Sequence, residues 1–366
     1  MDRRKVRRSL RGLNQMTFRI DRRALIATAG FGLGGLMLPG GRLAAQALLG
    51  MTGFTHNVAS GEPGSDSMLL WTRYVSATGS PSKVRAEVSD SRDFAKIVTG
   101  GQMVTGPWRD HTVKVTVDGL QPGRTYFYRF IAPDGTISPI GRTKTLPVGK
   151  TSKFNIAIFS CSNLGFGEFN AYGHAAARDD IDLVLHMGDY IYEYAGAANA
   201  VRLPTGGWVK SLDDYRDRYA LNKSEKGLQA MHAQCPWLVT WDDHEVSNDY
   251  AGLERGQSGN ITFNFAAQRA SAYQAFYEHM PIRASALTRS MDGLAQGAEL
   301  RIYGQVAYGQ LANLYLLDDR QYRDRQVCNK LGTYGSGFVN PDQCEDWFNP
   351  KRSLLGVEQS QWLDQA

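Results

Sequence analysis

The sequence predicts an all-β sandwich followed by a layered α/β domain. Short strand-like runs separated by turn signals fill residues 54–145, which is typical of a small sandwich. After residues 147–149 (Pro-Val-Gly) the pattern changes to short apolar runs, the first two with a helical stretch between them. We therefore expect a leader over 1–47, the sandwich over 48–147 and the α/β domain over 151–366.

The sandwich prediction rests on four runs rich in apolar, β-branched and aromatic residues. Asp-Gly and Pro-Gly pairs near these runs favour turns. The predicted strands are 68–71, 84–88, 112–117 and 126–130. This pattern explains Trp71 and Trp108 as core or rim residues, so we assign them no chemistry.

Four apolar runs predict the strands of the α/β domain. They are 154–159, 183–187, 237–241 and 311–317. The helical pattern of residues 171–180 lies between the first two runs, and this order is typical of a βαβ unit with parallel strands. A further helix is expected to begin near Gly356.

Side chains that bind metals follow the first three of these strands. In open α/β sheets, ligands gather beyond the carboxyl ends of the strands, so we expect these side chains to meet at one edge. The candidates are Cys161, Asp189, Tyr192, Asp243, His244 and Asn248. A thiolate, a phenolate, carboxylates and an amide oxygen suit hard or borderline cations, and a bridging carboxylate can hold two of them. Such a pair of cations is what the hydrolysis of a phosphate ester needs.

The first 47 residues have the layout of an export signal. The adjacent pair Arg22 and Arg23 precedes an apolar run over 24–38, and the small-residue sequence Ala-Gln-Ala ends at Ala47. The arginine pair predicts recognition by the twin-arginine export machinery, and the small-residue site predicts cleavage after Ala47. We expect the mature protein in the periplasm or outside the cell. We expect no stable membrane span after cleavage; the alternative is an uncleaved membrane anchor.

Positive charge is concentrated in this leader. It holds ten of the 41 lysines and arginines but only two of the 36 acidic residues. The remaining chain therefore has slightly more acidic than basic side chains, which disfavours nucleic-acid binding as its main role.

Two of the four cysteines form a candidate disulfide. Cys328 and Cys344 lie in one Gly-, Asn- and Pro-rich stretch, and an exported protein can oxidise such a pair.

Three segments carry a resemblance to a known family. Residues 159–162 (Phe-Ser-Cys-Ser), 188–193 (Gly-Asp-Tyr-Ile-Tyr-Glu) and 241–250 (Trp-Asp-Asp-His-Glu-Val-Ser-Asn-Asp-Tyr) resemble, in this order, the PhoD-type alkaline phosphatases. Residues 54–63 and 317–323 are similar to the family's opening β-domain and to one of its later landmarks. The resemblance covers nearly all of the chain after the leader.

The resemblance implies a metallophosphoesterase fold behind an immunoglobulin-like domain. It also implies ferric iron paired with calcium, and hydrolysis of phosphate mono- and diesters outside the cytoplasm by attack of a metal-bound hydroxide. His244 follows the metal-binding carboxylate, where such enzymes keep the histidine that contacts the phosphate or protonates the leaving group.

The same resemblance implies a set of metal ligands. Cys161 and Tyr192 would bind iron, and Asp189 would bridge it to the second metal. Asp243 and Asn248 would hold calcium. Four of the site residues also have a structural alternative: Cys161 as a buried thiol, Tyr192 as a packing residue, His244 as a satisfied polar residue and Asn248 as a turn former.

One part of the family pattern is not matched. The late Gly-Asp-x-His-type motif is missing, and no histidine follows His279. We interpret the sequence as truncated at its C-terminus. Two alternative functions remain open: a phospholipase-D-like phosphodiesterase acting on lipid head groups, and a non-catalytic exported binding module.

Overall fold

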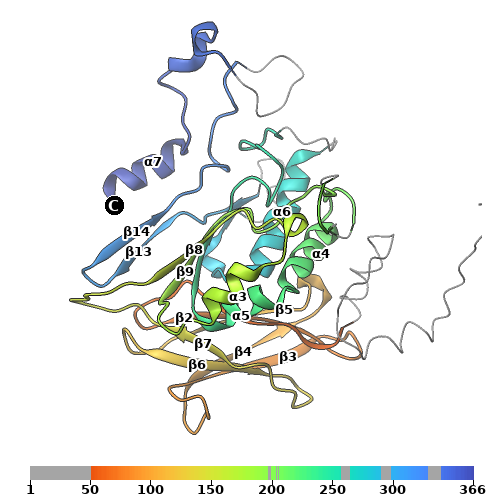
Figure 1. Cartoon of the computed structure of the whole chain (residues 1–366), viewed down its shortest axis with the longest axis vertical. Helices are drawn as coiled ribbons and strands as arrows, with labels where there is room; N and C mark the ends of the chain where they lie inside the picture. The colour runs from red at the N-terminus through yellow and green to blue at the C-terminus, as the bar shows by residue number, and fades with distance from the viewer. Residues whose placement is uncertain are drawn as a thin grey trace, which may run out of the picture. The chain divides into compact units, whose positions relative to one another are not determined.

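The N-terminal part of the described chain forms a β-sandwich (Figure 1). The computed structural model describes residues 51–196, 199–202, 204, 206–256, 264–289, 298–328 and 339–366. Strands β4, β3, β6 and β7 form one antiparallel sheet, and β5, β2 and β1 are neighbours in a second sheet. The strands are β1 Gly53–Gly61, β2 Met68–Val75, β3 Ser82–Ser89, β4 Ile97–Thr105, β5 Thr112–Val117, β6 Thr125–Ile131 and β7 Gly141–Lys144.

Side chains from both sheets meet in one buried cluster. Leu70 of β2 and Tyr128 of β6 are fully buried members of it. The sequence of β6 alternates buried and half-buried residues along its length, as a strand with one face on a core must. The sandwich prediction is confirmed. The predicted leader, with Arg22, Arg23 and the cleavage site at Ala47, lies outside the described residues.

Three parallel strands form the centre of the second domain. β8 (Ile156–Phe159) pairs with β9 (Leu183–Met187), and β9 pairs with β10 (Trp237–Thr240). Because all three run in the same direction, their carboxyl ends lie along one edge of the sheet. These are three of the strands that the apolar runs predict.

The two sheets join through a contact that no sequence pattern predicts. β1 pairs with β10 in parallel at Gly61 and Trp237, giving a six-stranded sheet with the order β5-β2-β1-β10-β9-β8. Gly61 is needed here because a Cβ atom would lie 2.2 Å from the carbonyl oxygen of Pro281. The indole N–H of Trp71 also donates to the carbonyl of Glu278, at 2.8 Å.

Helices cover one face of the parallel strands. They are α3 Asn170–Ala176, α4 Leu212–Lys223, α5 Lys226–Gln234 and α6 Phe265–His279. Helix α4 begins with a capping box: Ser211 accepts from the amide of Asp214, and the Asp214 carboxylate accepts from the amide of Ser211. α3 packs against α5, and α4 against α6.

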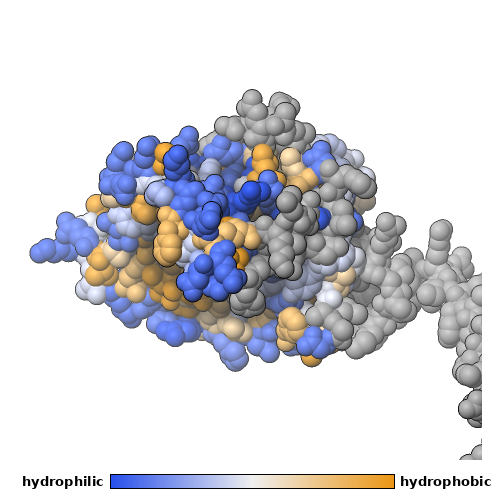
Figure 2. All heavy atoms as spheres, turned by 90° about the horizontal axis from the view of Figure 1, so that it is seen from above, coloured by the Kyte–Doolittle hydropathy of each residue, from blue (hydrophilic) through white to orange (hydrophobic). Residues whose placement is uncertain are grey.

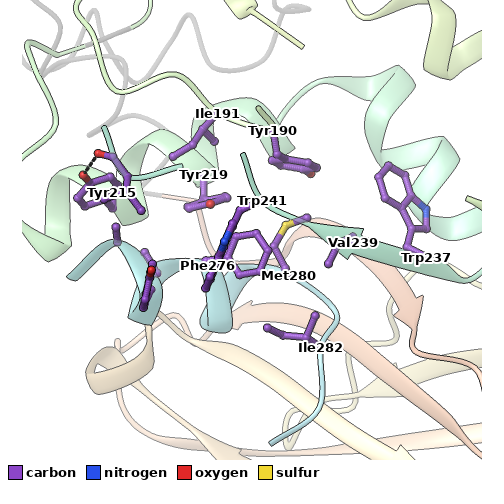
Figure 3. Packing of buried hydrophobic residues seen from close by; sticks show 14 of the residues in the cluster. Tyr190, Ile191, Tyr215, Tyr219, Trp237, Val239, Trp241, Phe276, Met280 and Ile282 are labelled. Atoms are coloured by element: carbon purple, nitrogen blue, oxygen red, sulfur yellow. Dashed lines mark hydrogen bonds between the residues drawn. The ribbon is translucent and has the colours of Figure 1, made fainter. Parts of the chain in front are cut away.

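The core between sheet and helices is aromatic (Figure 3). Trp241 stacks on Tyr273 at 4.4 Å between ring centroids and meets Phe276 edge-on at 5.1 Å. Tyr190, which follows β9, and Trp237, which begins β10, are both fully buried in the same cluster. Through Tyr190 and Trp241 this core contacts the segments that follow β9 and β10, which carry the candidate site.

The opposite face of the sheet carries a hairpin. β13 (Gly304–Tyr308) and β14 (Ala312–Leu316) pair only with each other among the described strands, so the fourth predicted strand does not enter the parallel sheet. Leu316 packs against Leu183 and Leu238 on this face. The second domain is therefore layered, with helices, sheet and hairpin in succession, and the α/β prediction is confirmed.

Short elements complete the described part of the chain. They are β11 Leu287–Arg289, β12 Glu299–Leu300 and α7 Gly356–Gln365. The ring of Trp362 on α7 contacts Tyr303 at 5.1 Å between centroids. The helix expected near Gly356 is thus present.

The molecular surface mixes polar and apolar residues. On the face seen in Figure 2, hydrophobic residues lie among hydrophilic ones. Within the described ranges, no helix is both long enough and apolar enough to cross a lipid bilayer.

Candidate metal centre

Three strand ends build the candidate site. Cys161 follows β8, Asp189 follows β9, and Asp243 with His244 follows β10. Ligand atoms of Asp189, Asp243 and His244 lie within 4.8 Å of one another. The structure therefore brings together side chains that lie more than 50 positions apart in the sequence.

Direct backbone contacts hold these segments together. The amide of Cys161 donates to the carbonyl of Gly188 at 3.1 Å, and the amide of Ser162 donates to the carbonyl of Asp189 at 3.0 Å. Gly188 has φ +98°, and a Cβ atom on it would lie 2.3 Å from the amide nitrogen of Asp242. The loops after β8, β9 and β10 are thus in contact through their main chains.

Two candidate ligands have a left-handed backbone. Cys161 has φ 55° and Asp189 has φ 53°, a region that residues other than glycine rarely adopt. Such a conformation costs free energy and persists only where surrounding contacts fix it. The backbone bonds between the two loops supply such contacts, and the strain is consistent with a functional site.

The carboxylate of Asp189 is short of donors. Its residue is 6% exposed, and its buried Oδ1 has no hydrogen-bond partner among the described residues. Its Oδ2 accepts from the hydroxyl of Tyr192 at 3.1 Å. Burial raises the pKa of Asp189, and the charge of Asp243 raises it further. A buried oxygen without a hydrogen-bond donor costs free energy, and a bound cation would offset this cost. The carboxylate of Asp189 therefore fits a metal ligand.

Cys161 and Tyr192 both lie beside this carboxylate. The thiol of Cys161 interacts with the side chains of Asp189 and Tyr192, and it is exposed, unlike a buried structural thiol. Burial, and then the charge of Asp189, raise the pKa of Tyr192. Although the residue is exposed, partial burial of its sulfur is the main cause that raises the pKa of Cys161. A cation at this place would relieve the mutual repulsion of the three groups and favour their charged forms.

Asp243 and Asn248 lie in the loop after β10. Oδ2 of Asp243 accepts from the amide of Asp249 at 2.6 Å. The side-chain amide of Asn248 donates to Asp249 at 3.3 Å, and its backbone amide donates to Glu193 at 2.7 Å. Calcium binding by these two residues stays a prediction.

His244 is held by a buried carboxylate. Its Nδ1 lies 2.7 Å from Oε2 of Glu193, whose side chain is 1% exposed. Burial alone would lower the pKa of His244, but the hydrogen bond and charge of Glu193, with smaller effects of Asp243 and Asp189, raise that pKa to about 9. Since Nδ1 is engaged, Nε2 is the nitrogen available to a ligand.

Three side chains that shape the site were not among the predicted residues. Glu193 orients His244, and the buried Glu245 accepts from backbone amides of two site loops. Arg320 follows β14; its Nε lies 2.5 Å from Asp242, and its guanidinium lies 3.7 Å from Asp243. A charged residue inside an aromatic run is a signal that could have singled out Glu193.

The cysteines outside the site are accounted for. Cys328 and Cys344 are joined by a disulfide with Cα atoms 5.8 Å apart. Cys235 is a buried free thiol.

The fold, with candidate metal ligands at its strand ends, is that of a metallophosphoesterase-type protein. A model of the PhoD-like phosphatase matches residues 156–366, and a model of the PhoD-like phosphatase N-terminal domain matches residues 42–147. The chain belongs to the PhoD-like phosphatase family.

Two relatives agree with this membership. Alkaline phosphatase D of Bacillus subtilis (strain 168) is 41% identical over an alignment of 326 residues, and the match covers 85% of this chain and 52% of the relative. A solved structure described as that of PhoD matches with a TM-score of 0.76 and 40% identity, over 86% of this chain and 59% of that chain. The chain thus spans about half the length of the curated relative that it matches.

Proposed function

We propose that this chain is an exported, metal-dependent phosphoric ester hydrolase that acts on phosphate mono- and diesters. The observation that carries the proposal is the buried Oδ1 of Asp189, which has no donor among the described residues, in a carboxylate grouped with Asp243 and His244. Family membership supports the class of reaction, because the match over residues 156–366 is to a phosphatase.

Ferric iron and calcium are the proposed cations. A thiolate from Cys161 and a phenolate from Tyr192 suit ferric iron, and both residues lie beside Asp189. Asp243 and Asn248 offer the oxygen atoms that calcium prefers, and Asp189 would bridge the two cations. Bound there, the cations would lower the pKa of a water molecule and neutralise charge on the phosphoryl group.

The protein's own side chains orient and protonate the substrate in this proposal. Glu193 fixes the ring of His244, so Nε2 can donate a proton to the leaving oxygen. Arg320 offsets the negative charge of Asp242 and Asp243, and its own contacts with them hold its guanidinium in place. These carboxylates can then lie close together without a large repulsive cost.

The proposal is tested by metal analysis and hydrolysis on the same protein. We expect stoichiometric iron, and hydrolysis of both p-nitrophenyl phosphate and bis-p-nitrophenyl phosphate that stops on chelation and returns with added metal. Asp189→Asn and Cys161→Ser should each lose iron and activity. Asp180→Asn, which alters a carboxylate paired with Arg178 on the surface, is the matched control and should keep both.

Two outcomes would contradict the proposal. Undiminished hydrolysis by the metal-free protein would rule out metal dependence. A folded protein that takes up neither metal and hydrolyses neither ester would instead support a non-catalytic module. Export is checked separately, by N-terminal sequencing of the mature protein for a start at residue 48.

A further inference from the structure

Glu245 is a buried carboxylate that contacts two different loops of the site. Its residue is 1% exposed. Oε1 accepts from the amide of Tyr190 at 2.6 Å, and Oε2 accepts from the amide of Asp242 at 2.9 Å. The amide of Asp189 also interacts with this carboxylate. One side chain therefore binds the loop after β9 and the loop after β10 at the same time.

Burial, and then the charge of Asp189, raise the pKa of Glu245 to about 8, whereas hydrogen bonds from three backbone amides oppose this shift. A carboxyl group is costly to bury unless its oxygens accept hydrogen bonds. The bonds to Tyr190 and Asp242 are therefore the contacts that stabilise Glu245 in this position.

The two loops that Glu245 joins also touch directly. A Cβ atom on Gly188 would lie 2.3 Å from the amide nitrogen of Asp242. The backbones of the two loops therefore approach each other so closely that only glycine fits at position 188. The next residue, Asp189, has the left-handed φ of 53°. A close approach next to a strained residue needs a contact that opposes separation of the loops, and Glu245 provides it.

We propose that Glu245 is a positioning residue that fixes the loop of Asp189 against the loop of Asp242 and Asp243, and so sets the spacing of the two metal-binding carboxylates. This inference rests on the proposed metal-dependent function. Both carboxyl oxygens of Glu245 bind backbone amides. Its effect on a bound cation therefore passes through Asp189 and Asp243.

Two variants test separately the hydrogen-bonding groups and the length of the Glu245 side chain. Glu245→Gln keeps the size of the side chain but turns one acceptor into a donor that faces a backbone N–H. Glu245→Asp keeps the carboxyl group but shortens the side chain by one methylene, so it cannot reach both amides. Glu278→Gln is the matched control, because Glu278 is also buried but binds Arg216.

The first measurement is amide hydrogen exchange of the metal-free proteins. We expect at least ten-fold faster exchange at Tyr190 and Asp242 in both Glu245 variants, and unchanged exchange at these amides in Glu278→Gln. If neither Glu245 variant folds, the wild-type protein still decides the question. Its amides of Tyr190 and Asp242 must be protected at least a hundred-fold relative to an unfolded chain, and unprotected amides would overturn the proposal.

The second measurement is cation affinity, by titration with calcium alone, together with the iron content after growth on iron. We expect at least ten-fold weaker calcium binding in both Glu245 variants and a lower kcat at similar KM. Faster exchange with unchanged calcium affinity would overturn the positioning role while leaving the proposed function intact. A wild-type protein that binds no cation would instead overturn the proposed function, and the exchange data would still decide whether Glu245 holds the two loops together.

Discussion

Nδ1 of His244 lies 2.7 Å from Oε2 of Glu193, and the other oxygen of the same carboxylate accepts from the amide of Asn248, also at 2.7 Å. Glu193 comes from the loop after β9, whereas His244 and Asn248 come from the loop after β10. The carboxylate thus fixes the orientation of the ring and favours its protonated form, and it ties the histidine to a second point of its own loop.

Glu193→Gln is expected to lower kcat about 10- to 100-fold with little change in KM. Glutamine can still accept from Nδ1 of His244, but it lacks the charge that stabilises the protonated ring, and its amide group would face the N–H of Asn248. Steady-state kinetics on a phosphomonoester measures the effect. Glu87→Gln, which alters a carboxylate paired with Arg129 in the sandwich, should leave kcat unchanged. Equal kcat values for the wild type and Glu193→Gln would contradict the role.

Gly188→Ala is expected to destabilise the protein by about 2 to 4 kcal/mol and to weaken cation binding. The added Cβ would meet the amide nitrogen of Asp242 at 2.3 Å, at a residue whose φ of +98° already disfavours a side chain. Urea unfolding gives the first quantity and metal titration the second. Gly304→Ala in β13 is the control, since a Cβ atom on Gly304 would meet no other atom within 4 Å, and it should change stability by less than about 0.5 kcal/mol.

The positions of the site residues could be predicted, but the contacts that hold them could not. Cys161, Asp189 and Asp243 each lie two positions after the end of an apolar run, and parallel strands bring such positions to one edge. The role of Glu245 depends instead on which amides its side chain reaches after folding. The same holds for the pairing of Gly61 with Trp237, because the register between two distant strands leaves no local pattern.

Loss of the Cys328–Cys344 disulfide is expected to lower the free energy of unfolding by about 3 kcal/mol, because the bond closes a loop with a sequence separation of 16. Thermal unfolding of Cys344→Ser against the wild type, each with and without reductant, tests this. Reductant should lower the melting temperature of the wild type and of Cys161→Ser, in which the disulfide is intact. It should have no effect on Cys344→Ser, and a drop of equal size there would assign the effect to another group.

Acid is expected to destabilise the fold through its buried histidines. Burial lowers the pKa of both His56 and His186 to about 3; Arg73 and His279 contribute to the shift of His56, and Lys223 to that of His186. An unfolded histidine has a pKa of about 6.5, so between these values the unfolded chain binds more protons and stability falls as the pH falls. At pH 5 the two residues together should lower the free energy of unfolding by about 4 kcal/mol relative to pH 8. Urea unfolding of the metal-free protein at both pH values measures this, with His56→Gln expected to remove about half of the difference. A difference between pH 8 and pH 5 that is the same in His56→Gln as in the wild type would show that this ring does not stay neutral in the fold.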